Sequence, residues 1–242
     1  NMKNNMKLIG GFMLAISVGS VEITAATHIV LPGTSIQAKV DLAEAGDSIV
    51  ILAGTYNESV TVNKQLDIKR AENAAVTING NFTIDGLTEQ FDLANFTIGG
   101  DTGKNVIVKN SKNVNLYNID LSKANGLSLT KSKVRAISCN IGLDVSSTDT
   151  ELLLEECTVA RNVDGHGILR LVKTTVTGLV VHRGGTWTPI ETALPSEFIV
   201  YQSTIKENII AKATESWIGY NELKWISEIQ HKGTIVGNTI DG

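Results

Sequence analysis

The sequence has few of the residues that mark several other classes of protein. It contains 3 prolines in 242 residues, which excludes a proline-rich linker, and its hydrophobic content of 42% excludes a chain too polar to form a core. The formal net charge is -4, so the chain offers no polycationic surface for phosphates, and nucleic acid is excluded as an expected partner. The 2 cysteines do not have the spacing of a zinc site.

The N-terminus has the pattern of a secretory signal peptide. Lysines precede an apolar run from Leu8 to Val21, and small residues follow it up to Ala26. The run has 14 residues, whereas a helix needs roughly 20 residues to cross a bilayer. We therefore predict that residues 1–26 are removed on export and that the mature protein is secreted, acts outside the cell or at its surface, and contacts no membrane. The alternative is an uncleaved membrane anchor.

A repeated pattern of apolar residues runs through the middle of the chain. Each row has two pairs of inward positions separated by a two-residue step, which predicts two short strands that meet at a bend. Successive rows start 23, 20, 18, 17 and 29 residues apart. The rows are Phe91-Leu93-Phe96-Ile98, Val114-Leu116-Ile119-Leu121, Val134-Ala136-Cys139-Ile141, Leu152-Leu154-Cys157-Val159, Leu169-Leu171-Thr174-Val176 and Phe198-Val200-Ser203-Ile205.

A third short strand introduced by glycine follows several rows, at residues 126–129, 142–145 and 178–181. Three strands in each turn, stacked about 4.8 Å from the next turn, predict an all-β right-handed parallel β-helix, which is a solenoid. Asn95, Asn118 and Asn140 lie beside the bends, where Asn tolerates left-handed backbone geometry. Upstream, a capping-box pattern at residues 34–37 begins an expected helix that stops at Gly46 and covers the first coil.

We expect one β-helix domain over residues 27–242. Within it, the helical cap covers about residues 34–45, the coils about residues 47–210, and an irregular aromatic C-terminal region residues 211–242. Residues 221–230 are interpreted as weakly helical, and residues 234–240 resemble one more coil.

The rows also predict which side chains stack inside the solenoid. One inward column should contain Ile119, Cys139, Cys157, Thr174 and Ser203, and the next Leu121, Ile141, Val159, Val176 and Ile205. Cys139 and Cys157 are then either a pair of small buried side chains or a disulfide. The second alternative is open because adjacent coils hold Cα atoms about 4.8 Å apart and because an exported protein meets oxidising conditions.

The segment from Ser35 to Gly100 resembles the opening coils of the pectin-lyase-like β-helix superfamily. The resemblance rests on Ala45-Gly46-Asp47-Ser48-Ile49, Gly54-Thr55-Tyr56-Asn57-Glu58 and Val76-Thr77-Ile78-Asn79-Gly80. Its part from Ile68 to Gly100 is similar to alginate-lyase and chondroitinase-B-type polysaccharide lyases, and to nonenzymatic surface β-helices. For a lyase, the resemblance implies that Lys and Arg remove a proton beside a uronate carboxylate, with calcium in many cases. In such enzymes the lysine belongs to a motif on a later coil, an Asn followed closely by Gly-Lys. This motif is not found here, since Gly103-Lys104 lies too early in the chain.

Asp164, His166 and Arg170 are the candidates for catalysis. Gly165-His166-Gly167, preceded by Asp164, resembles the histidine motif of polygalacturonases, which are also β-helices. A glycosidase needs two carboxylates that flank the scissile bond, and the Asn-Thr-Asp and Asp-Asp pairs of polygalacturonases are absent from this sequence. The other interpretation is a turn with an exposed histidine.

Candidate binding residues lie in the last quarter of the chain, which contains all 3 tryptophans. They are Arg183, Trp187, Trp217, Tyr220 and Trp225. Aromatic faces there would stack on sugar rings or bury themselves in a subunit contact, and the alternative is that they fill a C-terminal cap. We expect no cofactor, and we keep calcium as an alternative at Asp85, Asp92, Asp101, Asp120 and Asp144, which solvated charge explains equally well.

Together these patterns favour a noncatalytic extracellular module that is surface structural, adhesin-like or carbohydrate-binding. The alternative is a polysaccharide lyase or glycoside hydrolase that acts on an acidic polysaccharide. The expected partners are a polysaccharide or a second copy bound through the solenoid ends.

Overall fold

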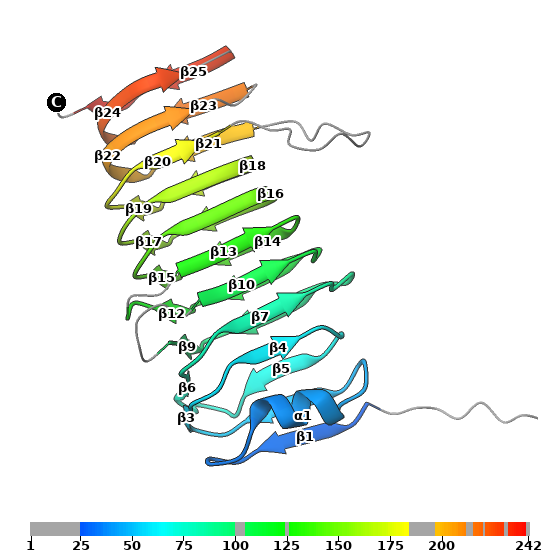
Figure 1. The fold of residues 1–242 in the computed structure, drawn as a ribbon. Helices are drawn as coiled ribbons and strands as arrows, with labels where there is room; N and C mark the ends of the chain where they lie inside the picture. Colours follow the sequence, from blue (N-terminus) through cyan, green and yellow to red (C-terminus); the bar gives the residue numbers. More distant parts are fainter. Residues whose placement is uncertain are drawn as a thin grey trace, which may run out of the picture.

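The structure is a computed structural model that describes residues 25–99, 105–123, 126–183, 197–211, 215–219, 221–229 and 232–240. Its strands stack in parallel as a solenoid of about nine turns, with the helix at the N-terminal end (Figure 1). The predicted all-β parallel β-helix with an N-terminal helix is therefore confirmed. In the described ranges, no helix is long and apolar enough to span a membrane.

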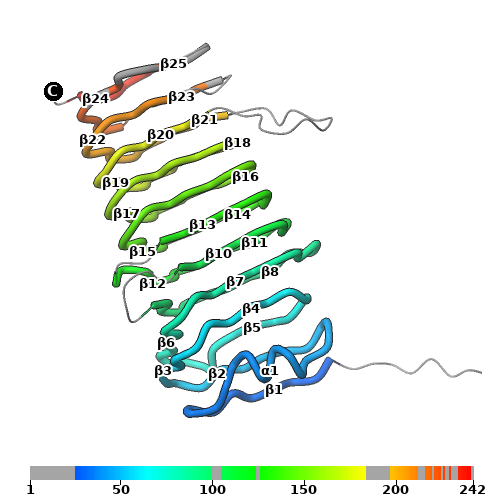
Figure 2. Tube along the Cα trace, viewed as in Figure 1, coloured from blue at the N-terminus to red at the C-terminus, as the bar shows by residue number. Residues whose placement is uncertain are grey.

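The turns build three faces, which we name the narrow, middle and groove faces (Figures 1 and 2). The narrow face comprises β3 (Gly54–Tyr56), β6 (Val76–Ile78), β9 (Thr97–Ile98), β12 (Asp120–Leu121), β15 (Asn140–Ile141), β17 (Thr158–Val159), β19 (Thr175–Val176), the first parts of β22 (Thr204–Ala211) and β24 (Glu222–Ile229), and β26 (Thr239–Ile240). The middle face comprises β4 (Val60–Val62), β7 (Phe82–Asp85), β10 (Asn105–Lys109), β13 (Gly126–Thr130), the first parts of β16 (Val145–Glu155) and β18 (Val163–Val172), β20 (Val180–His182), and the second parts of β22 and β24.

The groove face comprises β8 (Phe91–Ala94), β11 (Val114–Tyr117), β14 (Lys133–Ile137), the second parts of β16 and β18, β21 (Glu197–Tyr201), β23 (Glu215–Gly219) and β25 (Lys232–Val236). A smaller sheet of β1 (Thr27–Val30), β2 (Ser48–Ile51) and β5 (Asp67–Arg70) lies at the N-terminal end, where β5 contacts β8. The order narrow, middle, groove repeats along the chain, so residues about 17 to 29 apart in sequence become neighbours in space.

The helix α1 (Ile36–Leu42) covers the first turn as predicted, and it buries Ile36 and Val40. Ser35 caps it by accepting a hydrogen bond from the Ala38 N–H at 3.0 Å. The carboxylate of Glu58, which lies between β3 and β4, accepts from the Ser35 hydroxyl at 2.7 Å and from the Ile36 N–H at 2.7 Å. These acceptors satisfy helix N–H groups that have no partner within the helix.

The predicted inward columns are confirmed. Val159 pairs in register with Ile141 on one side and Val176 on the other, and Val176 pairs with Ile205. All ten predicted side chains are buried. The two-residue periodicity of the rows thus identified the core.

Left-handed backbone geometry occurs at the bends, but not at each predicted asparagine. Asn95 and Asn118 have positive φ angles of 66° and 49°. The prediction for Asn140 is wrong, because Ser138 takes that conformation with φ of 53° and Asn140 lies in β15. The left-handed residue is the one directly before the inward side chain, here Cys139, whereas Asn140 follows it.

The helix expected at residues 221–230 is also wrong, since β24 is a strand that pairs in parallel with β22 and β26. The described residues after 211 form strands of further turns, not an irregular region. The register of β22 against β24 shifts twice, between Ile205 and Asn208 and between Ile209 and Ile210. These irregularities interrupt the two-residue alternation, so the apolar spacing imitated that of a helix.

Hydrogen bonds run along one inward column at the bend between the groove and narrow faces. The Cys139 N–H donates to Cys157 Sγ at 3.4 Å, and the Cys157 N–H donates to Thr174 Oγ1 at 3.4 Å. The series continues from Thr174 N to Ser203 Oγ at 3.1 Å, and from Ser203 N to Asn221 Oδ1 at 2.8 Å. Each side chain therefore accepts from the backbone of the preceding turn.

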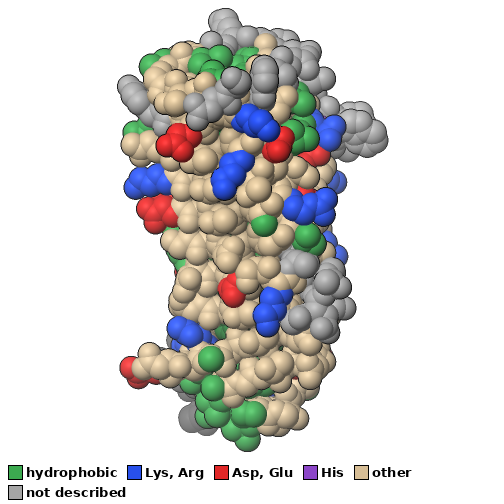
Figure 3. Space-filling model, turned by 90° about the vertical axis from the view of Figure 1, so that its left-hand side faces the viewer, with side chains coloured by type: hydrophobic (Ala, Val, Ile, Leu, Met, Phe, Trp, Pro, Cys, Tyr) green, Lys and Arg blue, Asp and Glu red, His purple; other side chains and the backbone are tan. Residues whose placement is uncertain are grey.

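The narrow face differs from the others in the side chains that it presents outward. Threonine recurs in register along it, with two acidic residues and one asparagine among Thr55, Thr77, Thr97, Asp120, Asn140, Thr158, Thr175, Thr204, Glu222 and Thr239. Figure 3 views the molecule from this side, and most of the surface there belongs to uncharged polar side chains and backbone. Most of the ion pairs beside which a ligand could bind lie on the other two faces.

Candidate functional site

The outer surface of the groove face carries one register column of polar and apolar side chains that includes a tryptophan. Parallel pairing places outward side chains of neighbouring strands beside one another, about 4.8 Å apart. From β8 to β23 the column contains Asp92, Asn115, Arg135, Leu153, Arg170, Ile199 and Trp217. Arg170 and Trp217, two of the predicted site residues, therefore share a column.

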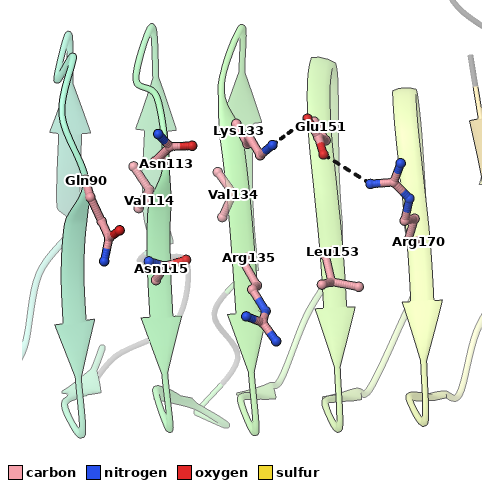
Figure 4. Close-up of a pocket in the computed structure, with 10 residues that line it drawn as sticks. All are labelled: Gln90, Asn113, Val114, Asn115, Lys133, Val134, Arg135, Glu151, Leu153 and Arg170. Carbon is pink, nitrogen blue, oxygen red and sulfur yellow. Dashed lines mark hydrogen bonds and ion pairs between the residues drawn. The ribbon is translucent and has the colours of Figure 1, made fainter. Parts of the chain in front are cut away.

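A shallow cavity with a volume of about 180 Å³ lies over β11, β14, β16 and β18 (Figure 4). It is lined by Gln90, Asn113, Val114, Asn115, Lys133, Val134, Arg135, Glu151, Leu153 and Arg170. Pockets that enclose a small molecule hold roughly 300–1,000 Å³. A cavity of this size and lining accommodates one part of an extended ligand better than a whole small molecule.

Charged side chains across this cavity neutralise one another. Glu151 accepts from Lys133 Nζ at 3.1 Å and from Arg170 Nη1 at 3.1 Å, which Figure 4 shows as a bridge across three strands. Arg170 Nη2 also donates to the carboxylate of Glu197 at 2.5 Å, and this hydrogen bond raises the pKa of Arg170 above its usual value. Arg135 pairs with a further carboxylate on β16, that of Glu155, at 2.6 Å.

A second depression, of about 320 Å³, lies on the same side of the molecule between β5 and β8. Asp92 lines it and accepts from Asn115 Nδ2 at 2.7 Å and from Gln90 Nε2 at 3.1 Å. Since Gln90 and Asn115 line the first cavity, the two depressions meet at β8. Polar groups thus line this side of the molecule over six successive strands, from β5 to β18.

An aromatic pair lies further along the same face. The rings of Tyr201 and Trp217 have centroids 5.5 Å apart at an interplanar angle of 45°, and both side chains are half-buried. A Cβ at Gly219 would lie 2.6 Å from Cη2 of Trp217. The indole therefore lies over Gly219, and a side chain at that position would have to displace it. Sequence reasoning missed Tyr201 and Gly219, although both sit two residues from the outward column.

The structure does not bring the three catalytic candidates together. Asp164 lies on the middle face, where it forms a double hydrogen bond with Arg183 at 2.8 Å to Nε and 2.7 Å to Nη2. Arg170 lies on the groove face, beyond the bend at Gly167. His166 is half-buried between them, and its Nδ1 has no hydrogen-bond partner within the described residues. Asp164 is thus joined to Arg183, a predicted binding residue, and not to Arg170.

Gly167 and His182 explain the local geometry of this bend. Gly167 has a φ of +107°, and a Cβ there would lie 2.6 Å from the Thr150 carbonyl oxygen. The imidazole of His182 points inward, with Nε2 at 2.8 Å from the Gly167 carbonyl oxygen and its ring 5.5 Å from that of Phe198. Burial lowers the pKa of His182 below its ordinary value. The buried imidazole therefore supports the bend in its neutral form.

The other predicted residues that the structure describes lie away from the cavity on the groove face. Trp187, Tyr220 and Asp101 lie outside the described residues, and of Trp225 the structure describes the backbone alone, which pairs with Asn208. Asp85 pairs with Lys109 at 3.2 Å, and Asp144 accepts from the Asn162 N–H at 2.9 Å. Across the described ranges, there is no group of three or more His, Cys, Asp or Glu that could hold a metal ion.

Comparisons with protein-family models, with curated proteins and with solved structures found no match for this chain.

Proposed function

We propose that the protein is a noncatalytic extracellular β-solenoid of the pectin-lyase-like kind that binds an uncharged polysaccharide chain along its groove face. The observation that carries the proposal is the outward column in which Asn115, Arg135, Leu153, Arg170, Ile199 and Trp217 follow one another at the spacing of successive turns. A polysaccharide is an extended repeating ligand, and this column is an extended repeating surface.

The side chains on this face suit a sugar chain. Trp217 offers an aromatic surface held by Tyr201 and Gly219, and the amides of Gln90 and Asn115 offer both donors and acceptors. The ion pairs fix the long side chains of Arg135 and Arg170 in place, so that binding orders fewer free rotamers. A preorganised shallow surface is thereby available to several sugar units.

Charge on this face supports an uncharged ligand over an acidic one. Lys133, Arg135 and Arg170 each pair with a carboxylate, so the cavity has no unmatched cation among its described lining residues. A uronate would have to compete with Glu151 or Glu197 for the guanidinium of Arg170. The same pairing opposes lyase chemistry, because a Lys or Arg that removes a proton has to lose its own proton first, and a carboxylate partner stabilises the protonated form.

The test is isothermal titration calorimetry of the full chain against uncharged and acidic polysaccharides. Barley β-glucan and xylan represent the first class, and polygalacturonate and alginate the second. We expect binding to a member of the first class, weakened about tenfold or more in Trp217→Ala because the aromatic anchor of the column is lost. Thr175→Ala, on the narrow face, is the matched control and should bind as the wild type does.

Two results would contradict the proposal. Binding that is unchanged in Trp217→Ala would place the ligand elsewhere. New absorbance from unsaturated uronate on incubation with polygalacturonate or alginate would establish a lyase and restore the enzymatic alternative.

A further inference from the structure

Cys139 and Cys157 occupy adjacent turns of the hydrogen-bonded inward column. Their neighbours Asn140 and Thr158 pair in register, as do Ile141 and Val159, so the two thiols stack directly. Both side chains are buried, with 3% and 2% of their surface exposed. They point in the same direction from strands whose Cα atoms lie about 4.8 Å apart, which is inside the Cα range of roughly 4.4–6.8 Å found for disulfides.

Hydrogen bonding alone does not explain why these two positions are cysteine. Cys157 Sγ contacts the Ala136 and Glu155 carbonyl oxygens, both at 3.4 Å. One turn on, Thr174 Oγ1 makes the equivalent bonds to the Leu154 and Val172 carbonyl oxygens at 3.0 and 3.1 Å. A hydroxyl therefore fills the same role with shorter bonds. What two stacked thiols can do, and two hydroxyls cannot, is join to each other.

We propose that Cys139 and Cys157 are a modification site, a dithiol that closes to a disulfide linking two adjacent turns of the solenoid. The co-reactant is a small-molecule disulfide such as oxidised glutathione. The Cys139 thiolate attacks one glutathione sulfur and releases a glutathione thiolate. The Cys157 thiol then loses its proton and attacks the Cys139 sulfur, which releases the second thiolate. Two protein thiols are oxidised, one glutathione disulfide is reduced, and the two thiolates take up the two protons.

Burial decides when this exchange can occur. In the closed turns, the hydrogen bond from the Cys157 thiol lowers the pKa of Cys139. Because both sulfurs are buried in the folded chain, glutathione reaches them while the turns on either side of β15 and β17 are open, during folding or local opening.

The experiment compares the pair in folded and unfolded protein at one redox poise. The full chain is equilibrated with reduced and oxidised glutathione at fixed ratios, in buffer and in concentrated urea, then quenched with acid. Free thiols are alkylated, and mass spectrometry counts the Cys139–Cys157 disulfide, the mixed disulfides and the free pairs. We expect the ratio of disulfide to dithiol to be at least about tenfold higher in buffer, because the fold holds the sulfurs together.

Linkage supplies an independent readout, because a fold that favours the disulfide has to be stabilised by it to the same degree. The oxidised chain should therefore unfold at a higher urea concentration than the reduced chain. Cys139→Ser and Cys157→Ser, which keep an acceptor and a donor in the column, should fold but show no such difference between oxidising and reducing buffer. An equal or lower disulfide ratio in buffer than in urea would overturn the proposal, and so would mixed disulfides in place of the internal bond.

Discussion

The two ends of the solenoid solve the same packing problem with different chemistry. At the bend between the groove and narrow faces, the N-terminal turns place Phe96 and Ile119 inside, whereas the C-terminal turns place Thr174, Ser203 and Asn221 there. Cys139 and Cys157 lie between the two sets. The same inward position can thus hold an apolar side chain or a side chain that is hydrogen-bonded to a neighbouring turn, and both occur in this fold.

Apolar burial and hydrogen bonding contribute differently to the stability and the register of the turns. Burying a large apolar side chain stabilises by about 1.5–3 kcal/mol, whereas an internal hydrogen bond contributes about 0.5–1.5 kcal/mol net. The polar series is weaker, but it depends on register, because each side chain meets one backbone N–H of the preceding turn. Apolar packing therefore contributes more stability at the N-terminal end, and hydrogen bonding fixes the register at the C-terminal end.

The largest expected effect comes from removing a large apolar side chain from the N-terminal part of the inward column. Phe96→Ala should lower the free energy of unfolding by about 3–5 kcal/mol, because a fully buried aromatic side chain leaves a cavity. Urea unfolding followed by circular dichroism measures this loss. Thr97→Ala, whose side chain points outward on β9, is the matched control and should change stability by less than about 0.5 kcal/mol. A loss below about 1 kcal/mol for Phe96→Ala would mean that the column collapses to fill the space.

Removing one hydrogen bond from the C-terminal part of the column should lower the free energy of unfolding by less. Thr174→Val keeps the shape of the side chain but removes the acceptor for the Cys157 N–H, which then stays buried without that hydrogen bond. The expected loss is about 1–3 kcal/mol. Thr175→Val, the outward neighbour on β19, provides the comparison, since it changes the same residue type without touching the column. If both variants lose equally little, the hydrogen-bonded series is not what holds the C-terminal turns in register.

The contrast between the two ends also decides what could be read from sequence. Rows such as Val114-Leu116-Ile119-Leu121 gave the core correctly, because inward positions alternate whatever residue fills them. The strand β24 was mistaken for a helix because two register shifts break that alternation. Polar inward residues such as Asn221 also give no hydrophobic signal, so the pattern fades where the column turns polar.

The groove face was harder to predict for a related reason. Arg170 and Trp217 were candidates, but their shared column depends on the register across β21, which the 29-residue interval before Phe198 conceals. The pairing of Arg170 with Glu151 and Glu197 likewise requires three turns to be aligned. Local spacing identifies which side chains face outward, whereas register alone decides which of them meet.

The cap on the N-terminal turn offers a smaller and local test. Glu58→Ala removes the acceptor for the Ser35 hydroxyl and for the first helix N–H groups. Losing such a cap should cost about 0.5–2 kcal/mol of stability. Glu72→Ala removes an exposed carboxylate from the same end of the molecule and serves as the control. Hydrogen exchange in α1 would report the loss directly, and unchanged protection of the helix amides would show that Ser35 alone is a sufficient cap.

The smallest expected effect is a pH dependence at the C-terminal end, from His182. Burial lowers the pKa of this imidazole in the folded chain, so the unfolded chain, with a pKa of about 6.5, binds more protons as the pH falls. The contribution of the neutral His182 imidazole to stability is therefore fully present well above pH 6.5 and is lost progressively below it. At pH 6.5 the loss is at most about 0.4 kcal/mol, because half of the unfolded imidazoles are protonated there.

Urea unfolding of the wild type and of His182→Gln between pH 7.5 and 5.5 isolates this contribution, since other titrating groups act in both proteins. As the pH falls, the free energy of unfolding of the wild type should decrease faster than that of His182→Gln. His166, which lowers the pKa of His182, and Asp164, which raises it, face the same bend, so the two effects partly offset each other. A wild type that gains stability relative to the variant as the pH falls would show that the folded imidazole is protonated, and the inward position of His182 would then need an acidic partner.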